Sequence, residues 1–210
     1  MVFGFEPFSE YFENPSSLVA DRLSKKRILG LRVIGKTLPV DFRTIEQTML
    51  DIIEPVRTEL ILGVGLAPGR NSISLEKVAL NYRLGSEKDN SGHLAPGAKV
   101  DARGPDALMS NLPVEEIVNR LREQGIPAKL SLSAGNYLCN QCMYIVIREA
   151  LKRNCLGGFV HLPAHERLAA KLSRDLPSMS LATMEDAVRK VILLSLRFRA
   201  RSLEPENSRT

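Results

Sequence analysis

Residues 130–153 read LSLSAGNYLCNQCMYIVIREALKR, and the hydrophobic pattern changes within them. The stretch opens with alternating apolar and polar side chains, which is typical of a β-strand. After the Ser-Ala-Gly segment, apolar residues recur at helical spacing, which predicts a helix that begins near Cys139. A strand that passes through a glycine turn into an amphipathic helix is typical of α/β proteins.

The same alternation extends along the rest of the chain. Further helices are predicted over residues 14–26, 42–56, 113–125 and 183–198, and further strands over 31–42, 58–66 and 157–162. Residues 72–81 are predicted to form a short helix, and residues 82–104 a long, polar, glycine-rich loop. The alternation predicts an α/β fold with helices on both faces of a mainly parallel central sheet.

The composition fits a single globular domain over residues 1–198, followed by a polar tail over 199–210 that we expect to be disordered. No apolar run reaches the roughly 18 residues of a membrane span, and the start does not resemble a signal peptide. The net charge is +5, but the basic residues are scattered and lack the aromatic interleaving of a nucleic-acid surface. Three cysteines are too few for a disulfide scaffold. We therefore expect a cytoplasmic protein with no membrane or nucleic-acid partner.

Cys139 and Cys142 form a Cys-x-x-Cys pair with three interpretations. A structural zinc site needs about four ligands, and His161 and His165 would have to complete a mixed set. A thioredoxin-like redox pair usually follows a turn that carries a tryptophan, and the chain has no tryptophan. The third interpretation is that one of the two cysteines is a nucleophile at the start of a helix.

The helical register separates the two thiols. Cys142 lies in register with Ile145 and Val146, so it should pack as a small apolar residue. Cys139 comes earlier, where unpaired backbone N–H groups and the helix dipole favour a thiolate and could hold an oxyanion. The alternative is that Cys139 is simply a buried residue at the helix entry.

A nucleophilic thiol needs a base and a group that orients the base. His161 ends a predicted strand, where the sites of parallel sheets form. Glu76 follows the loop GLAPGR within the predicted short helix, and it is the candidate for the orienting carboxylate. A core histidine and a surface glutamate are the simpler alternatives for these two residues. A phosphate or nucleoside site at GLAPGR is a further alternative, although the loop matches no phosphate-binding fingerprint.

Four motifs in the order of the chain resemble those of the pyroglutamyl peptidases, also called pyrrolidone carboxyl peptidases, of the archaeal and bacterial type I. They are GFEPF followed by NPS, VGLAPGR followed by ISLEKVALN, SAGNYLCN, and GGFVHLP. Together they lie within residues 2–195. The resemblance implies a three-layer α/β/α sandwich that assembles as a homotetramer.

The resemblance also implies a cysteine peptidase that removes N-terminal pyroglutamate from peptides without a metal or an organic cofactor. Cys139 matches the nucleophile, His161 the general base and Glu76 the acid of the triad, and the reaction passes through a thioester. Phe5 and Phe8 match aromatic residues around the pyroglutamyl ring, with core packing as the alternative. The backbone near Leu66 is expected to contact the lactam.

Two departures from the family pattern stand out. Many members carry N-x-x-D-x-R-x-x-D-N after the glutamate motif, whereas residues 81–90 read NYRLGSEKDN, with Leu84 and Ser86 in place of the Asp and the Arg. We expect Arg83 to reach the substrate instead, and the alternative function is a family member with altered specificity or weak activity. Only three residues precede Gly4, which indicates either a truncated first strand or a start codon assigned too far downstream.

Overall fold

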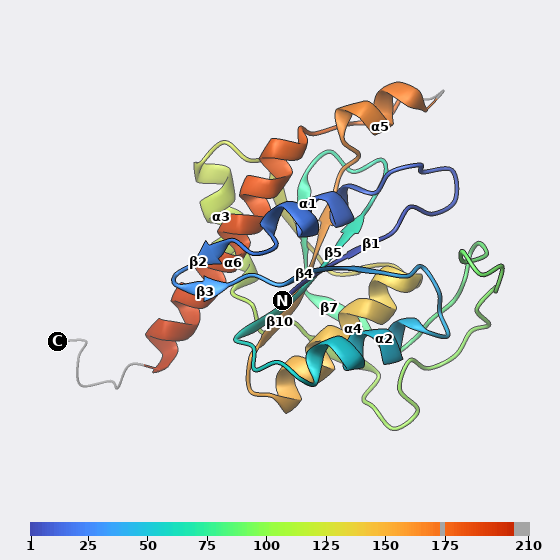
Figure 1. Ribbon diagram of the computed structural model, residues 1–210, viewed down its shortest axis with the longest axis horizontal. Coiled ribbons are helices and arrows are strands. Elements are labelled where there is room, and N and C mark those ends of the chain that lie inside the picture. The colour runs from blue at the N-terminus through green and yellow to red at the C-terminus, as the bar shows by residue number, and fades with distance from the viewer. Residues whose placement is uncertain (173–174, 204–210) are drawn as a thin grey trace.

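A six-stranded sheet forms the centre of the computed structural model, which describes residues 1–172 and 175–203 (Figure 1). Its strands, in spatial order, are β4 (Gly35–Leu38), β1 (Val2–Phe5), β5 (Leu60–Leu66), β10 (Leu156–Leu162), β6 (Ile73–Glu76) and β9 (Ala128–Ser131). The first four strands run parallel to one another. β6 is antiparallel to β10, and β9 is parallel to β6. The prediction of a mainly parallel sheet is confirmed, with two strands at one side reversed.

Helices cover both faces of this sheet (Figure 1). The helices α1 (Pro15–Leu23), α3 (Val114–Glu123) and α6 (Leu181–Leu203) lie on one face, and α2 (Ile45–Ile53) and α4 (Leu138–Lys152) lie on the other. The short helix α5 (Glu166–Lys171) follows β10. Two small ribbons complete the fold, β2 (Arg27–Ile28) with β3 (Leu31–Arg32), and β7 (Val78–Leu80) with β8 (Ala107–Met109). The fold is therefore the three-layer α/β/α sandwich that the sequence predicts.

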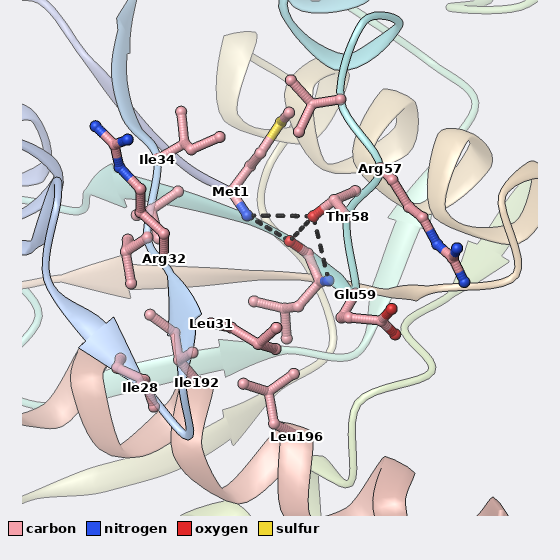
Figure 2. A pocket seen from close by; sticks show the side chains of 14 residues that line it. Met1, Ile28, Leu31, Arg32, Ile34, Arg57, Thr58, Glu59, Ile192 and Leu196 are labelled. Carbon is pink, nitrogen blue, oxygen red and sulfur yellow. Dashed lines mark hydrogen bonds between the residues drawn. The ribbon is translucent and has the colours of Figure 1, made fainter.

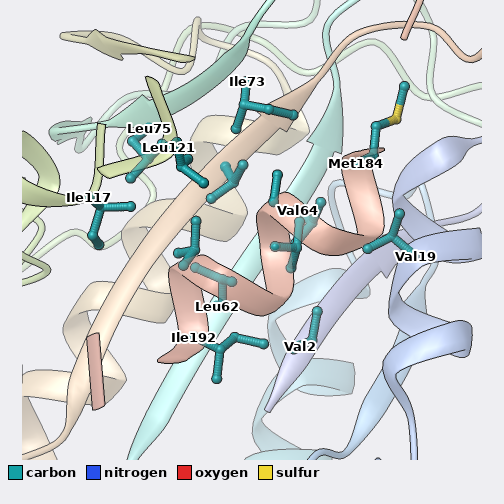
Figure 3. Close-up of a cluster of buried hydrophobic side chains, with 14 of the residues drawn as sticks. Val2, Val19, Leu62, Val64, Ile73, Leu75, Ile117, Leu121, Met184 and Ile192 are labelled. Atoms are coloured by element: carbon teal, nitrogen blue, oxygen red, sulfur yellow. The ribbon is translucent and has the colours of Figure 1, made fainter. Parts of the chain in front are cut away.

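Each face of the sheet has its own hydrophobic core. On the α6 face, Val2, Leu62 and Val64 point from β1 and β5 toward Met184 and Ile192 of α6 (Figure 3). The second core packs α2 and α4 against the other face. Because the two central strands are buried on both faces, their sequences are continuous apolar runs rather than alternating ones.

The helix after the GFEPF motif begins where the sequence predicts. The Asn14 side chain accepts a hydrogen bond from Ser16 N, and Pro15 occupies the first helical position, where a missing N–H has no consequence. Ser16 Oγ in turn accepts a hydrogen bond from Phe5 N at 2.9 Å. This cap ties the end of β1 to the start of α1.

Two segments differ from the predictions. Residues 72–81 do not form a helix, because residues 73–76 are buried between β10 and β9 as strand β6, and 78–80 form β7. The first strand, β1, has four residues, and all of them pair with β4. α6 continues to Leu203, into the segment predicted as a polar tail, and residues 204–210 lie outside the described residues. Within the described chain, no helix has the length and apolar character required to cross a membrane.

Candidate active site

Three central strands present the candidate residues on one face of the sheet. Gly65 of β5 pairs in register with His161 of β10, and His161 pairs with Ser74 of β6. Side chains in register point to the same face, and those two residues further along a strand point there too. Glu76 and Phe159, which pair with each other, therefore share the face of His161. The strands alone bring the predicted base and acid together.

The side chains of His161 and Glu76, the predicted base and acid, are hydrogen-bonded to each other. His161 Nδ1 lies 2.8 Å from Glu76 Oε1, and both side chains are buried. An ionised carboxylate only accepts hydrogen bonds, so Nδ1 carries the proton and Nε2 is the free nitrogen. The His161 ring packs edge-on against Phe159, with 5.0 Å between the ring centroids. These contacts fix the orientation of the imidazole.

The thiol of Cys139 reaches the same face from the first turn of α4. A Cβ atom at Gly65 would lie 2.9 Å from Cys139 Sγ and 2.9 Å from the Phe159 ring. The sulfur therefore sits over the glycine that pairs with His161. The structure thus gathers Cys139, His161 and Glu76 in one place, although they lie far apart in the sequence.

The charges of His161 and Glu76 suit a base and its partner. Burial raises the pKa of Glu76, but the hydrogen bonds from His161 and Arg70 outweigh it and leave the pKa below the usual range. Burial lowers the pKa of His161 by more than the neighbouring Glu76 raises it. Near neutral pH the carboxylate is therefore ionised and the imidazole is neutral, so the imidazole is free to accept a proton.

The prediction that the helix start makes Cys139 a thiolate is wrong for the resting site. Burial among apolar side chains, together with the nearby charge of Glu76, raises the pKa of Cys139 to about 12, and Arg70 only partly opposes this. The residue keeps partial exposure, but its sulfur faces the Phe159 ring and Gly65. The thiol is therefore protonated at rest, and a base must remove its proton during the reaction.

A small apolar pocket opens beside the thiol. Its walls are Phe5, Phe8, Asn14, Val40, Leu66, Tyr137, Leu138 and Cys139. Its cavity volume is about 20 Å³, roughly the room that one water molecule needs. No side chain that lines it is ionised at neutral pH, apart from the thiol when it loses its proton. Such a site suits a small, uncharged group next to the nucleophile.

The comparison with known proteins extends over almost the whole chain. A family model described as pyroglutamyl peptidase matches residues 1–197. The chain belongs to the pyroglutamyl peptidase family. The resemblance of the four motifs is thereby confirmed.

Relatives of this family are similar in sequence and in structure. Pyrrolidone-carboxylate peptidase 1 of Saccharolobus solfataricus is 53% identical over 184 residues, which cover 88% of this chain and 87% of the relative. Pyrrolidone-carboxylate peptidase of Saccharolobus islandicus is 51% identical over 189 residues and 90% of each chain. A crystal structure of pyrrolidone carboxyl peptidase from Pyrococcus furiosus matches with a TM-score of 0.91 and 33% identity, over 94% of this chain and 97% of that one.

Of the four residues expected to contact the substrate, three line the pocket beside the thiol and one does not. Phe5, Phe8 and Leu66 line the pocket beside the thiol. Arg83 does not line it, and its guanidinium donates instead to the carbonyl of Phe42 at 3.3 Å. Tyr137 lines the pocket and was not predicted, although its place two residues before Cys139 is a signal that sequence reasoning could have used.

The loop over residues 82–104 contacts the segment that carries Tyr137, one of the residues that line this pocket. Leu84 N donates to the carbonyl of Asn136 at 2.9 Å, and the hydroxyl of Tyr137 lies 3.3 Å from the carbonyl of Lys88. Further along, Asp89 accepts from Phe42 N at 3.0 Å. The loop that departs from the family pattern therefore braces the nucleophile segment, and Leu84 contributes backbone contacts that do not depend on its side chain.

A larger cavity lies at the opposite end of the strands, where β1 and β5 begin (Figure 2). It has a volume of about 380 Å³ and is lined by apolar residues of β2, β3 and α6, together with Arg32 and Arg57. The Met1 ammonium group, whose pKa burial lowers to about 6, bonds there to the carbonyl of Leu60. It contains none of the candidate catalytic residues, so its size does not make it the active site.

Proposed function

We propose that this chain is a cysteine peptidase that removes N-terminal pyroglutamate from peptides. The observation that carries this proposal is that Cys139, a neutral His161 and an ionised Glu76 share one face of the sheet, with Cys139 lining the small pocket. Membership of the pyroglutamyl peptidase family supports the choice of substrate. The reaction needs no metal or organic cofactor.

In the proposed mechanism, His161 Nε2 takes the proton of Cys139 as the sulfur attacks the pyroglutamyl carbonyl carbon. Glu76 stays ionised and stabilises the imidazolium that forms. The N–H groups of Leu138 and Cys139, in the first turn of α4, have no acceptor within the helix and are available to the oxyanion. His161 then gives its proton to the departing amine, which leaves a thioester. Water activated by His161 cleaves this thioester and releases pyroglutamate.

The pocket supports a lactam ring as the recognised group. Pyroglutamate has no free α-ammonium, and the walls around Cys139 offer no carboxylate to bind one. We propose that Phe5 and Phe8 contact the ring and that the backbone of Leu66 bonds to the lactam. Since the cavity is only about 20 Å³, the ring enters only if Phe8 and Tyr137 move apart.

We also propose a cytoplasmic homotetramer. Free cysteines at 139, 142 and 155 suit a reducing compartment, and a nucleophilic thiol must stay reduced to act.

The peptidase unit comprises residues 1–198, and α6 extends it to Leu203. Sedimentation of the purified protein at several concentrations tests the assembly, and a monomer at every concentration would refute the tetramer.

The decisive experiment measures hydrolysis of a chromogenic pyroglutamyl amide, with and without iodoacetamide. Cys139→Ser should lose at least about 10³-fold in kcat, because triads act as a unit. Cys155→Ala is the matched control, since Cys155 is buried at the start of β10, away from the pocket, and its loss should leave kcat unchanged. Hydrolysis that resists both iodoacetamide and Cys139→Ser refutes the mechanism.

A family member with altered specificity or weak activity is the second candidate. The observation that favours it is the absence of Arg83 from the pocket, together with Leu84 and Ser86 at the positions where many relatives carry Asp and Arg. The same assay with prolyl and alanyl amides separates the two candidates. A higher kcat/KM on either of these than on the pyroglutamyl amide would favour the second.

A further inference from the structure

One arginine outside the triad bonds directly to its carboxylate. Arg70 lies in the loop between β5 and β6, and its Nη1 donates to Glu76 Oε1 at 2.6 Å. The same oxygen accepts the proton of His161 Nδ1 at 2.8 Å. Arg70 Nη2 also lies 3.5 Å from the carbonyl of Ser133, in the segment that leads to α4. One side chain thus connects the acid of the triad with the loop that carries the nucleophile.

The Glu76 carboxylate needs such a partner because it is buried. Its side chain is 0% exposed, and a buried carboxylate stays ionised only if it is paired and hydrogen-bonded. His161 is neutral near pH 7, so it supplies a hydrogen bond but no charge. Among the residues that the structure describes, Arg70 is the one permanently charged cation paired with Glu76.

On the basis of the proposed function, we propose that Arg70 is a positioning residue of the triad. It holds Glu76 ionised and oriented toward His161, and its charge keeps the imidazole neutral until the thiol gives up its proton.

The charges that face His161 are consistent with this role. They come from Glu76 on β6 and Arg70 in the β5–β6 loop. The one further titratable group, in the part of the chain that the structure describes, is the Cys139 thiol of α4, which is uncharged at rest and lies over Gly65, the strand partner of His161. Glu76 raises the pKa of His161, whereas Arg70 lowers it. Arg70 also lowers the pKa of Cys139. Arg70 therefore favours both the free base and the loss of the thiol proton, and a residue that only stabilised the fold would do neither.

The first test is the pH dependence of kcat/KM for Arg70→Met on the pyroglutamyl amide. We expect kcat to fall at least about tenfold with KM within about twofold, as expected for an interaction that acts in the transition state. The acidic limb should move to higher pH, because the pKa of His161 rises when the neighbouring positive charge is removed. Arg70→Gln should show the same shift, and Arg70→Lys should keep the limb near that of the wild type.

Lys77→Met is the matched control. Lys77 follows Glu76 directly, but its side chain lies on the other face of the sheet and pairs with Glu115 of α3 at 3.5 Å. The substitution Lys77→Met removes one positive charge, as Arg70→Met does, but Lys77 does not contact the triad. The kcat and the pH profile of this variant should therefore equal those of the wild type. Wild-type kinetics in Arg70→Met overturn the proposal. A loss that is equal at every pH in both Arg70→Met and Arg70→Gln also overturns it.

A second test does not depend on the substrate. The rate at which iodoacetamide alkylates Cys139 is followed over pH by peptide mapping, in the wild type and in Arg70→Met. We expect slower alkylation at a given pH in the variant, because the thiol gives up its proton less readily. Equal rates overturn the proposal. If the wild type does not hydrolyse the pyroglutamyl amide, the proposed function fails, and the alkylation rates still decide the role of Arg70.

Discussion

The thiol of Cys139 can approach the sheet only because residue 65 has no side chain. Gly65→Ala would place a methyl group 2.9 Å from Cys139 Sγ and 2.9 Å from the Phe159 ring, closer than real Cβ contacts. We expect kcat to fall about 10²-fold, the effect of displacing a reacting atom by about 1 Å. The measurement is the amidase assay, with circular dichroism to confirm folding.

Gly63→Ala is the control for this prediction. Gly63 lies two residues earlier on the same face, and its added methyl group would meet the Phe159 ring and, at 3.4 Å, the sulfur of Cys142 rather than that of Cys139. Both variants press on Phe159, which packs against His161, so both should lose stability and some activity. Gly65→Ala should lose more activity per folded molecule, because only its methyl group meets the sulfur of Cys139. Equal activity losses in the two variants would contradict the role of Gly65.

At this scale the sequence predicted which residues meet but not their protonation. The motifs place Cys139, His161 and Glu76 together, and the strand register agrees. The pKa of Cys139 depends on how deeply its sulfur is buried, which no pattern within the chain reveals. Arg70 was also missed, because the spacing in GLAPGR does not show that the loop folds its guanidinium back onto Glu76.

Between elements, the Glu6 carboxylate joins three segments around the pocket. Glu6 Oε1 accepts from Val40 N at 3.0 Å and from Asn90 Nδ2 at 2.7 Å. Asn90 Nδ2 also donates to the carbonyl of Pro7 at 2.9 Å, and Asn90 N donates to the carbonyl of Val40. These contacts hold the segment before Phe8 against the loop that contacts Tyr137.

Asn90→Ala should therefore weaken substrate binding more than chemistry. The lost hydrogen bonds lie at an exposed position, so we expect about 1 kcal/mol, or a rise in KM of about fivefold with kcat within about twofold. Lys88→Ala is the control in the same loop, because the contact made there uses the backbone carbonyl rather than the side chain. A fall in kcat at constant KM in Asn90→Ala would contradict this prediction.

The type of one element was predicted wrongly for a physical reason. The run from Ile73 to Glu76 is buried on both faces, and a short buried run does not show whether it is a strand or a helix. The length of the connection before this run does predict the direction in which the strand runs. Only residues 67–72 link β5 to β6, too few for the crossover that a parallel strand requires, so β6 must run antiparallel to β5. The longer helices have clearer periodicity and were predicted correctly.

Across the whole molecule, ion pairs at the end of α4 away from the pocket connect distant segments. Glu149 is buried and pairs with Arg148, Lys152 and Arg153. Arg148 also pairs with Glu46 of α2 at 2.7 Å and with Asp101 of the long loop at 3.3 Å. Burial raises the pKa of Glu149, but the three cations outweigh it and leave the pKa below the usual range.

This network should make stability depend on pH. Because the pKa of Glu149 is lower in the folded state, its ionisation stabilises the fold above the ordinary range for glutamate, and this contribution is lost as the pH falls through the folded pKa. Glu149→Gln should lower the free energy of unfolding at pH 7 by about 1–3 kcal/mol, because the cations it leaves behind are partly exposed. Urea unfolding at pH 7 and near pH 3 should show this difference shrinking in acid. Glu123→Gln breaks an exposed pair with Arg120 and should change neither value measurably. A difference for Glu149→Gln that stays constant down to pH 3 would show that packing at this position, rather than its charge, stabilises the fold.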